Sequence, residues 1–331
     1  MLRMYGTLLV IGWTALLLYL MRRTPFFARV PGLRMRWVAA AFALKILAGT
    51  LVWAVYTCVH TDRATADVHK YFDDSRVLHE ALFTSPGDFL RMLFGFDADG
   101  QRFTEHYYSR MNNWVRRWDS GLPNDARTMI RFNALLRLAS FGHYHVHTVF
   151  ACFVSLIGLV ALYRALEPHA GGLRRGLALN LLLWPSVLFW GSGVLKECLL
   201  LMGLGLTCWG AMGLWPSGSW QRRGVLAAGV LLMMAVKPYV LACLAPPLVA
   251  WTWCAASPGR PWARFLSVHA AFVAAGFAIG AAWPAYDPLY LLALKQQDFI
   301  GLAATVPTGS YLPVEKLAPN VASFIHQLPR A

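Results

Sequence analysis

The run from Asp67 to Asp74, Asp-Val-His-Lys-Tyr-Phe-Asp-Asp, carries acids, a lysine and a tyrosine at helical spacing. Asp67, Lys70, Tyr71 and Asp74 are three or four residues apart, so on an α-helix they share one face. A carboxylate near an apolar boundary can serve as a general base, because a low dielectric raises carboxyl pKa values. Asp73 and Asp74 could also supply oxygen ligands to a divalent cation. An ordinary solvated amphipathic helix is the alternative interpretation.

A second candidate lies where Gly191-Ser192-Gly193 interrupts two apolar runs, just before Lys196 and Glu197. Backbone groups freed at membrane depth persist only where protein or a water-filled cavity satisfies them. The N–H groups at a helix start favour an anion, and Lys196 adds positive charge. The pattern indicates phosphate binding. A simple interfacial hairpin with a snorkelling lysine is the alternative.

A third candidate, Lys237-Pro238-Tyr239, also falls between two apolar runs. A lysine, a helix breaker and an amphipathic aromatic suit a phosphate or a lipid headgroup, but Tyr and Lys are equally common as membrane-interface anchors. Lys45 lies inside an apolar run. We expect it either to snorkel to the interface or to pair with a carboxylate, and we favour snorkelling.

The composition places these motifs in a membrane protein. Of the 331 residues, 57% are hydrophobic and 14% are charged, whereas a soluble domain has about 25% charged residues. A spanning helix needs roughly 20 apolar residues. The sequence predicts an all-α transmembrane bundle of about seven or eight spans, near 3–21, 37–58, 144–163, 176–191, 194–214, 224–240, 241–256 and 265–284.

The arginines predict the orientation. Cytoplasmic loops collect Lys and Arg, and pairs such as Arg22–Arg23, Arg174–Arg175 and Arg222–Arg223 mark alternate connections. The net charge of +14 is explained this way, without a nucleic-acid partner. The loop 59–143, which holds eleven of the sixteen acidic residues, then faces the outside.

The predicted organisation is a transmembrane domain over 1–284, which includes the extracytoplasmic loop 59–143, and an extracytoplasmic tail over 285–331. We leave open a continuation of this tail in a longer natural protein. Within the loop, helical periodicity predicts amphipathic helices over 68–83, 89–94 and 126–141, the second capped by Asp88. We expect these helices to lie at the outer membrane interface.

Several sequence patterns argue against disulfides, metal sites and nucleotide binding. The six cysteines lie within or at the ends of apolar spans without a CxxC spacing, which favours small buried hydrophobes over a disulfide or metal site. His143, His145 and His147 alternate and cannot all ligate one metal from a single helix. No phosphate-binding or dinucleotide-binding glycine motif occurs, so energy would come from an activated lipid donor or a gradient.

The layout resembles the C-type, multi-spanning glycosyltransferase superfamily, which uses polyprenyl-phosphate sugars. The likeness lies in a large first extracytoplasmic loop, interfacial helices, and an acid just after a span. The pattern Asp67-x-x-x-Tyr71, followed by Ala81-Leu82 and Pro86-Gly87, is similar to the loop signature of these enzymes. The stretches 133–142 and 185–197 also resemble a group of uncharacterised bacterial membrane proteins at the edge of the superfamily.

The resemblance covers roughly 60–260 and implies that Asp67 is the catalytic base. The chain departs from the family pattern in two ways: an extra span precedes the loop, and Val68 stands where a second acid is usual. This second departure puts a family-style metal in doubt, so a divalent cation is left open. The expected catalytic residues are Asp67, Asp74 and Tyr71, and the expected substrate-binding residues are Lys70, Lys196, Glu197, Lys237 and Tyr239.

The function that these features predict is hexosyl transfer from a polyprenyl-phosphate sugar to an envelope glycan or lipid acceptor, for assembly of a cell-envelope polysaccharide. The enzyme would be a multi-pass protein of the bacterial inner membrane, in contact with membrane lipids and acting at the outer face. A transporter or lipid flippase is the main alternative, because broken helices also suit transport. A non-catalytic subunit of an envelope-polysaccharide assembly is the third.

Overall fold

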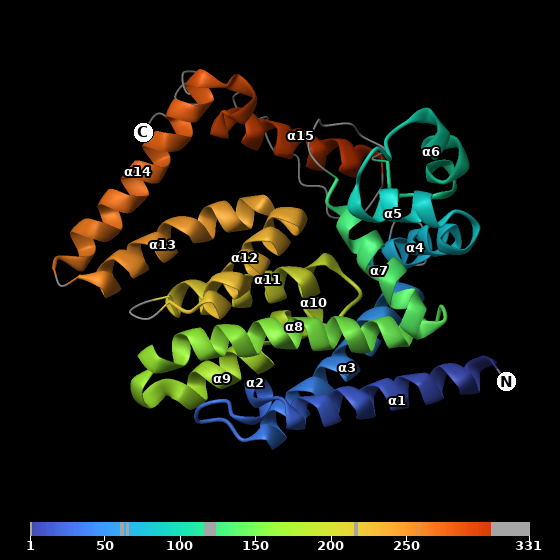
Figure 1. The fold of residues 1–331 in the computed structure, drawn as a ribbon, viewed down its shortest axis with the longest axis horizontal. Helices are drawn as coiled ribbons and strands as arrows, with labels where there is room; N and C mark the ends of the chain where they lie inside the picture. Colours follow the sequence, from blue (N-terminus) through green and yellow to red (C-terminus); the bar gives the residue numbers. More distant parts are fainter. Residues whose placement is uncertain are drawn as a thin grey trace. The chain divides into compact units, whose positions relative to one another are not determined.

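A computed structural model of the chain describes residues 2–59, 63, 66–115, 124–214, 218–257 and 259–305, and every regular element within them is a helix (Figure 1). The predicted all-α class is therefore confirmed. The chain divides into two compact units, one formed by 1–114 with 125–244 and the other by 115–124 with 245–331. We describe each unit separately.

Five helices in the described part of the chain are long and apolar enough to cross a membrane. They support a multi-pass membrane protein by length and composition. The five segments are Met4–Arg23, Met35–Cys58, Tyr144–His169, Pro238–Ala256 and Pro261–Ala282.

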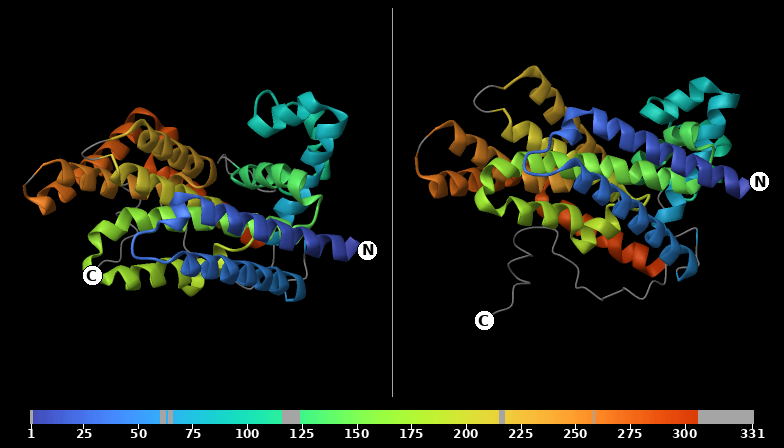
Figure 2. Two further views of the ribbon diagram at one scale, coloured as in Figure 1. Left: turned by 60° about the horizontal axis from the view of Figure 1, so that its bottom comes forward. Right: turned by 90° about the horizontal axis from the view of Figure 1, so that it is seen from below.

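Helix α8 (Tyr144–Leu166) is the centre of the first unit. It packs against α1 (Leu2–Arg23), α3 (Met35–Cys58) and α11 (Lys196–Met212), as the ribbon views show (Figures 1 and 2). One buried apolar cluster joins α1, α3 and α8, with members that include Leu17, Phe42, Val149 and Leu156. Such packing leaves the other face of α1 exposed, with apolar side chains that include Leu8 and Ile11.

Glycines bring α11 against its neighbours at backbone distance. A Cβ atom on Gly205 would lie 1.8 Å from the Gly158 carbonyl oxygen of α8. On another face of α11, a Cβ on Gly210 would lie 2.6 Å from the Leu226 backbone nitrogen of α12 (Trp220–Val236). Small residues at helix interfaces allow this close approach in membrane proteins. Helix α11 is therefore fixed between α8 and α12.

The span predicted over 176–191 is two helices, α9 (Arg174–Leu183) and α10 (Pro185–Trp190). Pro185 accounts for the break, because a proline disfavours helical backbone at the preceding residue. Trp184 accordingly has ψ 126°. Three short helical segments lie in the connections between longer helices: α2 (Pro25–Ala28), η2 (Glu167–His169) and η3 (Gly171–Leu173).

The described residues of the segment 59–143, predicted as one large loop, fold into helices close to those predicted. They are α4 (Asp67–Thr84), α5 (Pro86–Phe94), α6 (Gln101–His106), η1 (Tyr108–Arg110) and α7 (Ala126–Ser140). Helix α6 was missed because it is too short to show a period. Asp88 lies inside α5 and accepts a hydrogen bond from the Tyr107 hydroxyl at 3.0 Å, so its predicted capping role is wrong.

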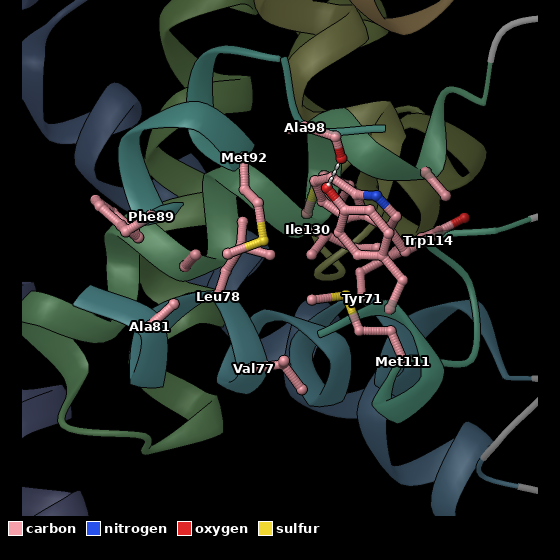
Figure 3. Packing of buried hydrophobic residues seen from close by; sticks show 14 of the residues in the cluster. Tyr71, Val77, Leu78, Ala81, Phe89, Met92, Ala98, Met111, Trp114 and Ile130 are labelled. Carbon is pink, nitrogen blue, oxygen red and sulfur yellow. Dashed lines mark hydrogen bonds between the residues drawn. The ribbon is translucent and has the colours of Figure 1, made fainter. Parts of the chain in front are cut away.

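A second buried apolar cluster holds these loop helices together. Figure 3 shows how Leu78, Met92 and Ile130 meet from α4, α5 and α7, with Tyr71 and Trp114 at the other side of the cluster. Val194, Leu199 and Val236 also belong to it, so the loop packs onto the start of α11 and the end of α12. Thr128 adds a hydrogen bond from α7 to the Ala235 carbonyl at 2.7 Å.

The remaining helices are α13 (Pro238–Ala256), α14 (Pro261–Ala282), η4 (Pro284–Tyr286) and α15 (Pro288–Thr305). Within the second unit, η4 packs against both α14 and α15. The helix predicted over 289–302 corresponds to α15. The end of the predicted tail, 306–331, lies outside the described residues.

The glycine contacts predict a steric test of this arrangement. Gly205→Val should lower the free energy of unfolding by about 1–3 kcal/mol or more, because the added atoms meet the α8 backbone, which cannot move aside cheaply. Thermal unfolding of the purified protein in detergent would measure the loss. Gly224→Val is the matched control, because a Cβ there has no neighbour within 4 Å. An equal loss in both variants would contradict the packing.

Candidate functional site

Helix α4 places its functional side chains through its amphipathic character. Val68, Tyr71, Leu78 and Ala81 are buried on one face, which leaves Asp67 at the first turn with a side chain that is 46% exposed. An acidic residue in the first turn is favoured by the helix dipole. The sequence therefore puts an accessible carboxylate at the start of the helix.

Asp67, Lys70 and Tyr71 form a local group, as their spacing predicted. The Lys70 ammonium pairs with the Asp67 carboxylate and lies 5.3 Å from the centre of the Tyr71 ring. The Asp67 carboxylate also acts on the Tyr71 hydroxyl, through its charge and through hydrogen bonding, and raises the pKa of this hydroxyl. Lys70 and Tyr71 therefore both lie next to this carboxylate, while about half of its surface stays open.

Lys196 reaches the same place from α11. Its ammonium lies 5.4 Å from the centre of the Tyr71 ring and pairs with Asp125 at 2.8 Å. Asp125 precedes the first residue of α7, and its side chain makes no capping hydrogen bond there. The carboxylate is thus directed across to α11, which joins the loop to the broken helix.

Glu197, the next residue, accepts a hydrogen bond from the Lys237 ammonium at 2.8 Å. Lys237 lies between α12 and α13. We call the seven residues gathered in this way the lysine–carboxylate cluster: Asp67, Lys70, Tyr71, Asp125, Lys196, Glu197 and Lys237. Its three lysines and three carboxylates make three ion pairs, so its formal charge is zero.

Tyr71 is the buried centre of the cluster. Burial raises the pKa of its hydroxyl well above the usual value, and the charges of Asp67, Asp125 and Glu197 raise it further. Tyr71 therefore stays protonated. The catalytic role that the sequence predicts for Tyr71 stays a prediction.

Two residues predicted for the site, Tyr239 and Asp74, are not part of the lysine–carboxylate cluster. Tyr239, on the first turn of α13, acts electrostatically on Lys237 but has a side chain that is largely exposed. Asp74 is buried and accepts hydrogen bonds from the backbone amides of Asn112 and Asn113 at 2.9 and 2.8 Å. Burial raises the pKa of Asp74, against the effect of these bonds. The contacts of Asp74 are those of a residue that holds the 112–113 turn.

The geometry gives little support to a cation at Asp73 and Asp74. Asp73 accepts two hydrogen bonds from the Arg63 guanidinium, each at 2.7 Å. Across the part of the chain that the structure describes, no three His, Cys, Asp or Glu side chains gather as metal ligands.

Two observations were not predicted from the sequence: the place of Asp125 in the cluster, and the burial of Lys45, which lies outside the cluster. Nothing in the local sequence of Asp125 reveals its partner Lys196, 71 positions away. Lys45 is completely buried and has no hydrogen-bond partner, so the expected snorkelling is wrong. The signal for Lys45 was its place near the middle of a long apolar run, where a charge is a functional candidate by default.

No protein-family model, curated protein or solved structure matches the chain.

The ion pair between Lys196 and Asp125 predicts a charge-swap result. Lys196→Asp alone should destabilise the protein, because it places a further acid against Asp125, Glu197 and the Tyr71 ring. The double variant Lys196→Asp with Asp125→Lys should recover most of the loss, since opposite charges face each other again. Thermal unfolding midpoints of the two singles and the double would measure the recovery. Strictly additive effects would show that the side chains do not interact.

Proposed function

We propose that this protein is a membrane glycosyltransferase that moves a hexosyl group from a polyprenyl-phosphate donor to an envelope glycan or lipid acceptor. The observation that carries the proposal is the cluster itself: an accessible carboxylate, Asp67, pairs with Lys70, and the Tyr71 ring lies between Lys70 and Lys196. Glu197, the neighbour of Lys196, adds Lys237 to the cluster. A base next to anion-binding groups is what such a transfer requires. The resemblance of the loop to C-type glycosyltransferases supports the same assignment.

The proposed topology follows from the arginine pattern and the apolar helices. The chain would cross the bacterial inner membrane seven or eight times, with the loop 59–143 at the extracytoplasmic face. The five apolar helices of the described part support the multi-pass arrangement. The further crossings would be supplied by the region of α9 to α12, whose glycine contacts hold short helices together.

In the proposed reaction Asp67 removes the proton from an acceptor hydroxyl. The acceptor oxygen then bonds to C1 of the sugar, while the bond from C1 to the phosphate oxygen breaks and polyprenyl phosphate leaves with that electron pair. Attack from the face opposite the phosphate inverts C1. Tyr71 orients the base through its hydrogen bond.

The lysines would bind the donor phosphate by partner exchange. Lys196 and Lys237 pair with Asp125 and Glu197. A phosphate can replace these carboxylates, because it presents the same kind of charged acceptor. Lys70 remains with Asp67. The exchange keeps both ammonium groups paired, and the released carboxylates of Asp125 and Glu197, whose side chains are 27% and 31% exposed, would turn to water.

A transporter is the second candidate, and one observation favours it. Lys45 lies buried in α3 beside the break between α10 and α11, and transporters often bind their substrates where helices are discontinuous. A transporter would move the polyprenyl-phosphate sugar across the membrane without cleaving the bond between sugar and phosphate.

The transfer mechanism predicts a clear difference between two variants. Asp67→Asn should lower turnover by about 10²–10⁴-fold, because the general base is lost, while donor binding persists. Lys196→Met should weaken donor binding as well, since the donor phosphate is charged in the ground state. The assay is incubation with a labelled polyprenyl-phosphate sugar, followed by quantification of released polyprenyl phosphate.

Asp99→Asn is the matched control, with the same chemical change on an exposed loop carboxylate that pairs with Arg127. It should leave turnover unchanged. Full turnover in Asp67→Asn would remove this residue from the mechanism. Uptake of the labelled sugar by vesicles with no released polyprenyl phosphate would favour the transporter.

A further inference from the structure

The connection between α1 and α3 is rich in arginine and contains no acidic residue. Five arginines lie within 22–36, and two more begin α9. A cluster of roughly four to eight basic residues beside a spanning helix attracts anionic lipid. A specific binding site, rather than a diffuse attraction, requires that the fold hold some of them together. The residues concerned are all exposed: Arg22, Arg23, Arg29, Arg34, Arg36, Arg174 and Arg175.

A tight turn brings Arg29 and Arg34 close together. The Leu33 amide donates to the Val30 carbonyl at 3.2 Å, which closes a β-turn. Gly32 has φ 68°, the left-handed conformation that glycine adopts at the third position of such a turn. The first and last Cα atoms of a β-turn lie within about 7 Å of each other. Because Arg29 precedes the turn and Arg34 follows it, both side chains start from the same end of the turn.

The end of α8 holds this turn in place. The Tyr163 hydroxyl donates to the Pro31 carbonyl at 2.9 Å, and the Arg164 guanidinium donates to the Arg29 carbonyl at 2.8 Å. Arg164 also donates to the Phe26 carbonyl at 2.9 Å. The backbone that carries Arg29 is therefore fixed to α8, while the side chain of Arg29 is exposed.

Arg174 reaches the same turn from α9. A Cβ atom on Gly32 would lie 3.6 Å from the Arg174 Cδ atom. The Arg174 guanidinium pairs with Glu167 at 2.7 Å, and the two side chains are 53% and 7% exposed. A guanidinium has five N–H donors, so one carboxylate does not satisfy all of them. Glu167 thus positions Arg174 beside the turn and leaves it donors for a further ligand.

The charge around this turn is not balanced. Glu167 is the only acidic residue in the segments 22–36 and 163–175, so positive charge exceeds negative charge there. Guanidinium groups match the oxygens of a phosphate through paired hydrogen bonds. The turn therefore presents donors suited to a phosphate group.

Exposed apolar side chains border the arginines. Leu173 immediately precedes Arg174 and is 77% exposed, and Trp37, three residues after Arg34, is 56% exposed. Tryptophan is enriched at the level of the lipid headgroups. A phospholipid supplies an apolar part for such side chains, whereas a free phosphate does not. The combination favours a lipid over a soluble anion.

We propose that Arg29, Arg34 and Arg174 bind the phosphodiester headgroup of one anionic phospholipid from the membrane leaflet that they face. The proposal rests on the multi-pass membrane character of the chain, which the apolar helices support. None of these arginines belongs to the lysine–carboxylate cluster. The proposal is therefore independent of the proposed transferase activity.

The test is lipid binding to the purified full chain in a non-ionic detergent, measured by native mass spectrometry. Titration with phosphatidylglycerol should give one saturable adduct per chain. Phosphatidylcholine, which has the same phosphodiester but no net charge, should give none at the same concentrations. The double variant Arg29→Gln with Arg34→Gln should weaken the affinity for phosphatidylglycerol about 100-fold, because each hydrogen bond between charged groups contributes about 10-fold or more.

Arg22→Gln with Arg23→Gln is the matched control. It removes the same charge from the same connection but outside the turn, and it should leave the affinity unchanged. Arg174 is kept in both variants, because its loss would leave the buried Glu167 charge unpaired. Phosphatidylglycerol should raise the unfolding midpoint of the wild type and of the control, but not that of the Arg29 and Arg34 double variant, since a ligand of the folded state stabilises it.

The absence of a saturable phosphatidylglycerol adduct in the wild type would overturn the proposal. An equal loss of affinity in the two double variants would also overturn it, by showing only a diffuse attraction between arginines and anionic lipid. Displacement of the lipid by inorganic phosphate at similar concentrations would assign the turn to a soluble anion instead. If the Arg29 and Arg34 double variant does not fold, Arg34→Gln alone decides the question, with an expected loss of about 10-fold.

Discussion

The structure of the first unit depends on how the broken helix at 191–195 is satisfied inside the bundle. A helix break frees backbone carbonyls and amides, and these groups are costly where water is excluded. Ser155 and Cys152 of α8 donate to the freed carbonyls of Gly191 and Ser192. Because the turn is fixed to α8, α11 begins at Lys196, which places Lys196 and Glu197 against the loop.

The same constraint explains why charges collect at this position. Half-buried lysines need partners, and each of the three cluster lysines has its own carboxylate. The partners come from α4, from the residue before α7 and from α11, so the ion pairs also tie the loop to the apolar helices. Breaking one pair would leave a partly desolvated charge, which costs more than the pair contributes. The proposed donor phosphate would be an exception for the lysines, because it would supply them with a replacement partner.

Much of the local structure could be predicted from the sequence. Helices α4, α7 and α15 follow apolar periodicity, and the break at Gly191-Ser192-Gly193 follows from glycine in an apolar run. That the motifs of Lys70, Lys196 and Lys237 lie close together could be inferred only from the predicted membrane topology, which puts all three at the outer face. The pairing of Lys196 with Asp125 was not predictable, since it depends on the packing of α7 against the end of α12.

The burial of side chains accounts for the remaining differences between the sequence predictions and the structure. Asp74 and Asp67 share a helix and a spacing, but Asp74 is buried among the amides of Asn112 and Asn113, whereas Asp67 is open. Sequence spacing cannot distinguish the two. The side chain of Lys45 is long enough to extend towards the membrane interface, but the packing of α3 against the 191–195 turn encloses its ammonium.

The central claim is that three separate parts of the chain form one lysine–carboxylate cluster. Zero-length cross-linking tests it most directly, because a water-soluble carbodiimide joins only a lysine and a carboxylate in contact. Treatment of the folded protein, followed by digestion and mass spectrometry, should yield peptides joined through Asp125 and Lys196 and through Glu197 and Lys237. The Asp67–Lys70 pair within α4 is the internal control. Modification of that pair without either long-range product would contradict the account.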